Sequence, residues 1–301
     1  MYKAIKTGDL KNVIKYHNKG VSWIPDAIGV AAAHGHLEVV KWLYEHNTRR
    51  CICRAMDSAA RNGHLDVVKW LHEHRTEGCT TDAMDSAAAN GHLDIVKFLH
   101  ENRSEGCTRL AMEWSAANGF LEVLQFLYNN RSEGCTEWIM EDTAGNGHLE
   151  IIKWLHEKRI TDYTKYAMDC AASNGHLHVV KWLHENRTDG CTAFAMNYAA
   201  YKGHLHVVKW LHKNRTEGCT TYAMDLATSN GHLHIVKWLH ENRTEGCTAE
   251  AMNIATRKGH LEILQFLYSN YKYLVTKVNQ QTYQKIFPLI QEDFRDRKSV
   301  V

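Results

Sequence analysis

The chain carries a Gly-x-Leu tripeptide that returns every 28 residues. A looser copy, Gly8-Asp9-Leu10, precedes the series by 27 residues. The regular copies begin at Gly35, Gly63, Gly91, Gly119, Gly147, Gly175, Gly203, Gly231 and Gly259. A constant period between 20 and 50 residues is typical of solenoids, in which each repeat buries its apolar side against its neighbours. The sequence therefore predicts a stack of repeats whose function depends on a long surface.

One repeat, residues 63–90, predicts two helices. Its first half places apolar residues around most of a helical wheel and leaves one narrow polar stripe, which indicates a largely buried helix. Gly78 suits the end of this helix, and Thr80 can cap a second helix over 81–89. Asn90-Gly91 then favours a left-handed turn into the next unit. Each repeat is therefore predicted to be helix, loop, helix and tight turn.

The string Ala87-Ala88-Ala89-Asn90-Gly91-His92-Leu93-Asp94-Ile95-Val96 resembles the ankyrin turn from inner to outer helix, and the pattern covers roughly residues 1–268. Two features differ from the usual ankyrin repeat. The period is 28 rather than 33, and Asp82-Ala83-Met84-Asp85 stands where the family has Thr-Pro-Leu-His. The resemblance, to shortened repeats of protist and large-DNA-virus families, implies an all-α solenoid with β-hairpin fingers shortened or absent.

The repeat boundaries divide the chain into three parts. Residues 1–34 are expected to form an N-terminal capping repeat, and residues 35–268 the regular ankyrin-type repeats. Residues 269–301 leave the pattern and are expected to form a C-terminal cap with a polar tail.

Composition narrows the class of partner and the compartment. A net charge of +2 argues against a nucleic-acid binder, which would show a strongly basic face. The N-terminus lacks the apolar segment of a signal peptide, and no apolar run is long enough to span a membrane. The nine cysteines lie mostly in one phase of the repeat, too far apart for disulfides along the stack, and are expected to be free thiols. A cytoplasmic protein is therefore expected, with the nucleus possible and secretion not.

The most variable positions between repeats lie on the first helix and are rich in bulky apolar residues. Six of the sixteen residues in two neighbouring columns are aromatic, in a chain that is 10% aromatic overall. An exposed apolar patch with a polar rim is typical of an interaction site. In ankyrin proteins this inner helix lines the concave groove, so the resemblance indicates the same face. The predicted partner-binding residues, in repeats 3 to 8, are Leu110, Trp114, Trp138, Tyr166, Phe194, Tyr198, Tyr201, Tyr222, Leu226 and Ile254. The alternative is that these rings pack laterally between inner helices.

Polar columns of the repeat predict mainly structural roles. The acid or amide column from Asp57 to Asn253 falls, on the helical wheel, beside the variable face. It takes the place of the family's histidine, and a hydrogen bond between repeats is the favoured role, with recognition of basic groups on a partner as the alternative. The arginines in phase from Arg75 to Arg243 are expected to close helix ends.

The 21 histidines do not predict a metal centre. His178, His206 and His234 replace acids on the polar stripe of the second helix. They stand about one repeat apart, whereas a metal needs donors about 2 Å from one centre. A solvated face is expected, with a pH-sensitive patch as the alternative. No catalytic motif is found, so the sequence predicts no metal, no cofactor and no catalytic residue.

These patterns together predict a non-enzymatic scaffold that binds a protein partner through the concave inner-helix face, without nucleic acid or membrane. Three alternatives remain open. The chain could be an adaptor that brings a target to a second factor such as a ubiquitin ligase, for which 269–301 is the candidate second surface. It could be an enzyme that uses Cys/His chemistry. A monomer is possible, but its repeated aromatic faces could also drive self-association.

Overall fold

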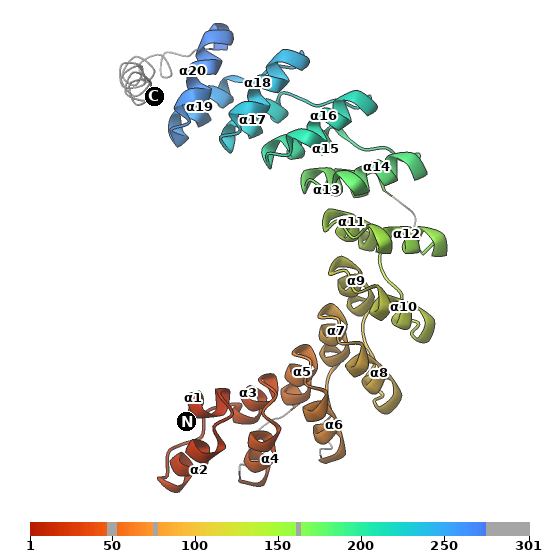
Figure 1. The fold of residues 1–301 in the computed structure, drawn as a ribbon, viewed down its shortest axis with the longest axis vertical. Coiled ribbons are helices and arrows are strands. Elements are labelled where there is room, and N and C mark those ends of the chain that lie inside the picture. The colour runs from red at the N-terminus through yellow and green to blue at the C-terminus, as the bar shows by residue number, and fades with distance from the viewer. Residues whose placement is uncertain (47–52, 75–77, 161–163, 275–301) are drawn as a thin grey trace, which may run out of the picture. The chain divides into compact units, whose positions relative to one another are not determined.

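The computed structural model describes residues 1–46, 53–74, 78–160 and 164–274. Within these ranges the chain forms paired α-helices and one short 3-10 turn, η1 (Lys272–Leu274), and contains no strand (Figure 1). The prediction of an all-α stack of helical repeats is thus confirmed. Most of the predicted C-terminal cap and tail, 275–301, lies outside the described residues.

Odd-numbered helices are the inner helices and even-numbered helices are the outer ones. The inner helices are α1 (Tyr2–Lys6), α3 (Ala27–Ala33), α5 (Cys53–Arg61), α7 (Thr81–Ala89), α9 (Leu110–Ala117), α11 (Trp138–Gly145), α13 (Tyr166–Ser173), α15 (Ala193–Tyr201), α17 (Tyr222–Ser229) and α19 (Ala249–Lys258). The outer helices are α2 (Leu10–Asn18), α4 (Leu37–His46), α6 (Leu65–His74), α8 (Leu93–Asn102), α10 (Leu121–Asn130), α12 (Leu149–Lys158), α14 (Leu177–Asn186), α16 (Leu205–Asn214), α18 (Leu233–Asn242) and α20 (Leu261–Asn270).

The helices form two compact units. Unit 1 comprises residues 1–139 and 150–161, and unit 2 comprises 140–149 and 162–301. Within unit 1 the inner helices α3, α5, α7 and α9 pack side by side, and within unit 2 so do α13, α15, α17 and α19. These inner helices also pack against the outer helices that follow them.

Helix α7 begins and ends as the sequence predicts. The Thr80 hydroxyl accepts a hydrogen bond from the Asp82 N–H (3.1 Å), which satisfies a free donor of the first turn. At the other end Gly91 adopts φ +79°, a left-handed conformation, and the His92 N–H bonds back to the Ala87 carbonyl (2.9 Å). A Cβ atom at Gly91 would also collide with the Phe120 ring of the next repeat. Backbone conformation and close packing both require glycine there.

Small residues let the inner helices approach closely. The nearly invariant side of α7 is fully buried, as the helical wheel predicts, and includes Ala83, Met84, Ala87 and Ala88. The outer helices share one buried pattern, in which two neighbouring apolar residues are followed three positions later by a leucine. On α16 these residues are Val207, Val208 and Leu211. The core is therefore a continuous apolar layer within each unit, which each repeat extends.

The acid or amide column links each inner helix to the next repeat. Asp85 accepts hydrogen bonds from the backbone N–H and the hydroxyl of Thr108 (2.8 and 2.7 Å). The same position bonds the threonine 23 residues later in six other repeats, namely Asp57–Thr80, Glu113–Thr136, Glu141–Thr164, Asp169–Thr192, Asn197–Thr220 and Asp225–Thr248. The structural role is confirmed. The helical wheel was wrong to place the column beside the outward face, because Asp85 is buried.

The histidine of the Gly-His-Leu turn also joins neighbouring repeats. His64 Nε2 lies 3.2 Å from the Ala33 carbonyl, and His92 Nε2 lies 3.1 Å from the Arg61 carbonyl. Each of these carbonyls is at the end of the preceding inner helix, where no intrahelical donor is available. These histidines therefore stabilise the stack.

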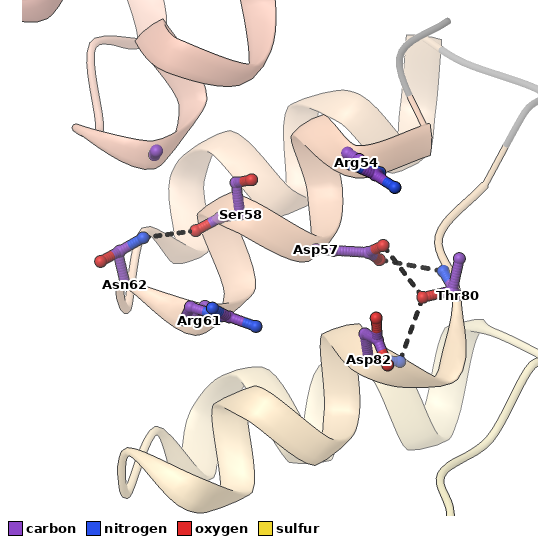
Figure 2. A pocket seen from close by; sticks show the side chains of 8 residues that line it. Arg54, Asp57, Ser58, Arg61, Asn62, Thr80 and Asp82 are labelled. Atoms are coloured by element: carbon purple, nitrogen blue, oxygen red, sulfur yellow. Dashed lines mark hydrogen bonds between the residues drawn. The ribbon is translucent and has the colours of Figure 1, made fainter.

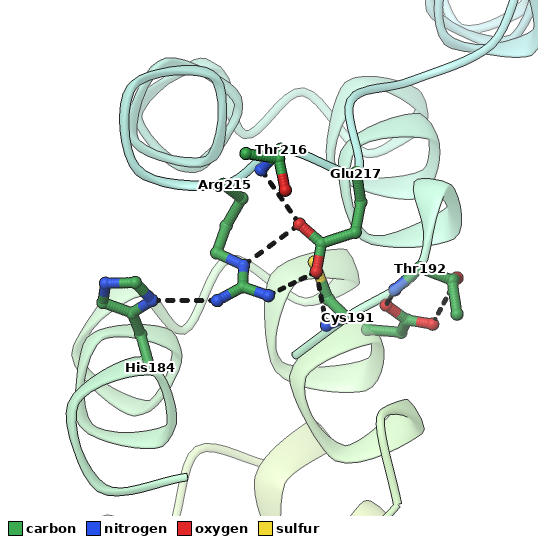
Figure 3. A network of polar contacts seen from close by, with 7 residues as sticks. His184, Cys191, Thr192, Arg215, Thr216 and Glu217 are labelled. Atoms are coloured by element: carbon green, nitrogen blue, oxygen red, sulfur yellow. Dashed lines mark hydrogen bonds and ion pairs between the residues drawn. The ribbon is translucent and has the colours of Figure 1, made fainter. Parts of the chain in front are cut away.

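Five arginines close the ends of outer helices as predicted, but their side chains also make contacts beyond the helix. They are Arg103, Arg131, Arg187, Arg215 and Arg243, and Arg75 lies outside the described residues. Arg215 follows α16 and points into a network that reaches the preceding repeat (Figure 3). Its guanidinium pairs with Glu217 and lies 3.2 Å from His184 Nδ1, and the Glu217 carboxylate accepts from the Cys191 N–H (3.1 Å). Arg103, Arg131, Arg187 and Arg243 also pair with the acid two residues later. The arginine thus serves an ion pair in the loop and contacts between repeats more than the helix dipole.

The network predicts a pH-dependent contribution to stability. Burial opposes ionisation of Glu217, but the hydrogen bonds from Arg215 and the Cys191 N–H outweigh it and lower the pKa to about 2. A lowered pKa means that the carboxylate stabilises the fold above the unfolded pKa of about 4.5 and loses this effect as the pH falls toward 2. Glu217→Gln is therefore expected to lower the free energy of unfolding by about 1.5 kcal/mol at pH 7.

Urea unfolding of both proteins, followed by circular dichroism between pH 7 and pH 2.5, measures this difference. The difference should shrink steadily below pH 4.5, since the variant has no carboxylate to titrate. An equal difference at pH 7 and pH 2.5 would contradict the assigned role.

Candidate protein-binding face on the inner helices

Six of the ten sequence-predicted binding residues are exposed aromatic side chains. Their exposed fractions run from 41% for Trp114 to 62% for Tyr222. The remaining four predicted residues are half-buried, namely Leu110, Tyr201, Leu226 and Ile254. The exposed six are therefore not core residues between inner helices, the alternative that the sequence left open.

Unit 2 gathers seven of the ten on consecutive inner helices. We call Tyr166, Phe194, Tyr198, Tyr201, Tyr222, Leu226 and Ile254 the unit 2 aromatic patch. On α15 the rings of Phe194 and Tyr198 lie 5.8 Å apart, and those of Tyr198 and Tyr201 lie 6.3 Å apart. These distances are typical of favourable aromatic pairs. The rings of α15 thus support one another while two of the three remain open to solvent.

Charged side chains surround the unit 2 aromatic patch. The Lys165 ammonium lies 5.8 Å from the centre of the Tyr166 ring, within cation–π range. Lys202 follows α15, and Lys258 is the last residue of α19. Among the described residues they bond to neutral groups, Asn174 Oδ1 (2.5 Å) and the Ser229 carbonyl (2.7 Å). The patch therefore has an apolar centre and a polar rim, as interaction sites do.

Unit 1 carries Leu110, Trp114 and Trp138, which we call the unit 1 aromatic patch. A hollow of about 460 Å³ lies beside Trp114 and extends to Arg61, at the end of α5, and to Asn62, which follows it. A second hollow, of about 710 Å³, begins at the same two residues and is drawn in Figure 2. Seven of its eight lining residues are polar or charged; the eight are Ala33, Arg54, Asp57, Ser58, Arg61, Asn62, Thr80 and Asp82.

The polar side of this face was missed by the sequence reasoning. Arg54, Ser58 and Arg61 occupy the same variable columns as the aromatic residues, spaced four and three residues apart, so they share one side of α5. Neither arginine forms an ion pair among the described residues. Variation between repeats marks these polar positions as it marks the aromatic ones. The prediction of binding residues rested on bulky apolar side chains and so did not include them.

The cysteines are poor nucleophiles where the structure describes them. Burial raises the pKa of Cys79, Cys191 and Cys247 to about 12, and that of Cys107, Cys135, Cys170 and Cys219 to about 11. A thiol needs its thiolate form for nucleophilic attack, so these side chains are not activated at neutral pH. All seven are free thiols.

Between residues 1 and 274, outside the three gaps, His, Cys, Asp and Glu side chains do not come together in groups of three or more that could hold a metal ion. Over these residues, no helix combines the length and the apolar character needed to cross a bilayer.

Comparison with known proteins identifies the repeats. A model of ankyrin repeats (many copies) matches residues 29–72 and 139–184, and one of ankyrin repeats (3 copies) matches 58–137 and 196–281. Curated proteins give no match. Among solved structures, the human ASB11 ankyrin repeat domain aligns over 54% of this chain and 83% of its own, with 18% identity and a TM-score of 0.45. The two models together cover most of the repeat region, and the chain belongs to the ankyrin repeat family.

Proposed function

We propose that this protein is a non-enzymatic scaffold that binds a protein partner through the aromatic patches of its inner helices. Ankyrin repeats are generally protein–protein interaction modules. The observation that carries the proposal is the exposure of six aromatic side chains, from 41% to 62%, at positions that vary between otherwise similar repeats. Random variation at solvent-exposed positions without a binding role would yield small or charged residues there.

The unit 2 aromatic patch supplies the anchors. Tyr and Trp are enriched among residues whose truncation costs most binding energy. The rings stand on packed helices whose buried sides are fixed by alanine and methionine, so little ordering entropy is lost on association. Lys202 and Lys258 at the rim favour a partner with acidic groups beside its apolar contact surface.

The unit 1 aromatic patch supports a similar contact with a more polar neighbourhood. Trp114 offers a large apolar ring. The hollow beside it, and the second hollow that adjoins the first at Arg61 and Asn62, can accept polar side chains of a partner. Arg54 and Arg61 are free of ion pairs within the described part of the chain and can pair with carboxylates. The partner is therefore expected to present apolar and acidic side chains together.

A pull-down with the variant Tyr166→Ser, Phe194→Ser, Tyr198→Ser, Tyr222→Ser tests the proposal. Partners captured by the wild type are identified by mass spectrometry, and their affinities are then measured with purified components. Affinity is expected to fall at least about hundredfold, because one anchor residue already contributes about 2 kcal/mol, or about thirtyfold, and the variant removes four aromatic side chains. Circular dichroism and thermal unfolding should show a normally folded variant, since the rings are exposed.

The matched control changes two exposed tyrosines away from the patches, Tyr128→Ser on α10 and Tyr273→Ser in η1. It should keep the partner and its affinity. Equal affinity of the wild type and the patch variant for every captured partner would rule out the unit 2 aromatic patch as the binding site. Loss of the folded state in the patch variant would show that the rings are structural.

A further inference from the structure

Three consecutive outer helices of unit 2 lack an acid that five outer helices earlier in the chain carry. The second position of α4, α6, α8, α10 and α12 is acidic, and on α4 and α12 it pairs with the lysine three residues later, Glu38–Lys41 and Glu150–Lys153, both at 2.8 Å. On α14, α16 and α18 the same position is His178, His206 or His234. Lysine is retained in each case, as Lys181, Lys209 and Lys237.

We call these six residues the His/Lys row. All six side chains are exposed, and none of the three lysines forms an ion pair among the residues that the structure describes. The change alters the charge of the outer face. Helices α4, α6, α8, α10 and α12 contain nine acids and five lysines, whereas α14, α16 and α18 contain two acids and four lysines. The outer face of unit 2 is therefore basic over three adjacent repeats.

Two of the row's three histidines are held in place by hydrogen bonds. His178 Nε2 lies 3.1 Å from the Gly147 carbonyl, and His206 Nε2 lies 3.3 Å from the Gly175 carbonyl. A carbonyl only accepts, so Nε2 carries the hydrogen and Nδ1 is left to take up a proton. The charge can therefore be gained without loss of the hydrogen bond.

The histidines of the Gly-His-Leu turns behind the row are harder to charge than a free imidazole. Burial, followed by the adjacent row histidine, lowers the pKa of His176, His204 and His232, which lie 6.0 to 6.1 Å from the row. Other charged or titratable groups on and around these helices include His148, His184, Glu185, Lys202, His212, Lys213, His240, Glu241, His260 and Glu262. These include two acids on the three helices and one on α20. The arginines that end the three helices are each paired with an acid, as Arg187–Asp189, Arg215–Glu217 and Arg243–Glu245. No acid occupies the row itself.

We propose that the His/Lys row binds an acidic segment of a protein, and binds it more tightly as the pH falls from 8 to 6. The row is on the outer helices, so this site is separate from the aromatic patches of the inner helices and stands independently of their function. Successive rows of a packed helical stack are about 10 Å apart, close to three residues of an extended chain. A segment with carboxylates at that spacing can contact all three repeats.

The chemistry of the row favours carboxylates over the other polyanions. A surface for single-stranded nucleic acid needs exposed aromatic rings for the bases, and a membrane surface needs exposed apolar side chains. The tryptophans of these helices, Trp182, Trp210 and Trp238, are half-buried. The row therefore presents histidine and lysine side chains to a ligand, and these suit the exposed carboxylates of a peptide.

The test uses the full chain and a fluorescein-labelled peptide of twelve glutamates. Fluorescence anisotropy at pH 6 and pH 8, at low salt because exposed charges are screened, gives the dissociation constants. Binding is expected to be about tenfold tighter at pH 6, since each of three exposed charge pairs contributes about two- to threefold. The variant His178→Glu, His206→Glu, His234→Glu restores the acid found in unit 1 and should lose this difference.

The charge-matched control Ser104→Glu, Gln125→Glu, Ser132→Glu adds the same three negative charges to unit 1 and should keep the pH effect. Absence of binding, or equal binding by the wild type and the histidine variant, would overturn the proposal. A single-stranded oligouridine RNA and vesicles containing phosphatidylserine are measured in parallel. If the RNA or the vesicles bound more tightly than the glutamate peptide, and the histidine variant lost this binding, the row would be assigned to that ligand. The proposal of an acidic protein segment would then be overturned.

Discussion

Replacing Asp169 with alanine is expected to lower the free energy of unfolding by about 3 kcal/mol. The buried carboxylate accepts two bonds from Thr192, at 2.8 Å from its N–H and 2.6 Å from its hydroxyl. That hydroxyl in turn accepts the Phe194 N–H (3.1 Å) and so caps α15. Alanine would leave a half-buried backbone N–H without an acceptor and release the cap, at a cost of about 1 to 3 kcal/mol for the first alone. Urea unfolding at pH 7, followed by circular dichroism, measures the loss.

Asn197 provides a natural control for this experiment. It holds the same position one repeat later and bonds the same two groups of Thr220. Its Oδ1 accepts from the Thr220 N–H and its Nδ2 donates to the Thr220 hydroxyl, both at 3.0 Å. Burial raises the pKa of Asp169 against the effect of Thr192, so the charge itself is costly. Asp169→Asn should therefore cost less than about 1 kcal/mol. If the asparagine variant were as unstable as the alanine variant, the charge rather than the hydrogen-bond geometry would hold the two repeats together.

The fold could be predicted from the sequence because the period is unbroken. A glycine every 28 residues fixes each tight turn, and the helix between Thr80 and Asn90 begins and ends where its caps predict. Local rules of capping and turn geometry decide these boundaries, and the same rules act in every repeat. Packing of one repeat on the next then follows from the apolar columns.

The polar columns could not be placed as well, because a helical wheel treats each helix as isolated. Asp85 falls beside the variable face on the wheel, yet the next repeat covers it and supplies two donors from Thr108. Arg215 shares its column with other arginines after the outer helix, but its partners, Glu217 and His184, come from the loop and from the preceding repeat. Contacts between repeats are not visible in the pattern of one.

The candidate site was predicted in part. Exposure of Trp138 and Tyr222 follows from the wheel, since both lie opposite the invariant alanines. The hollows around Arg61 could not be inferred, because their size depends on small side chains such as Ala89 on the neighbouring helix. The size of a side chain at each position can be taken from the sequence. The volume of a hollow depends on how two neighbouring helices pack.

The same alanines set the second large effect, for Ala199→Leu on α15. Ala199 is fully buried, and α15 packs closely against both α13 and α17. Across the nine repeats from residue 31 onward, the paired positions of Ala199 and Ala200 hold only alanine, serine or threonine. A leucine must push neighbouring inner helices apart or adopt a strained rotamer, and the free energy of unfolding is expected to fall by about 3 kcal/mol.

Ala89→Leu on α7 is the matched control. Ala89 is half-buried, lines the hollow beside Trp114, and belongs to the column in which α15 carries Tyr201. A leucine there can extend into the hollow, so the free energy of unfolding should change by less than about 0.5 kcal/mol. Stability in a repeat array depends on the interfaces between neighbouring repeats. Ala199→Leu should therefore also broaden the urea transition, because the repeats on the two sides of α15 would no longer unfold together. If Ala199→Leu unfolded at the same urea concentration and with the same slope as Ala89→Leu, the close approach of the inner helices would not be what limits side-chain size there.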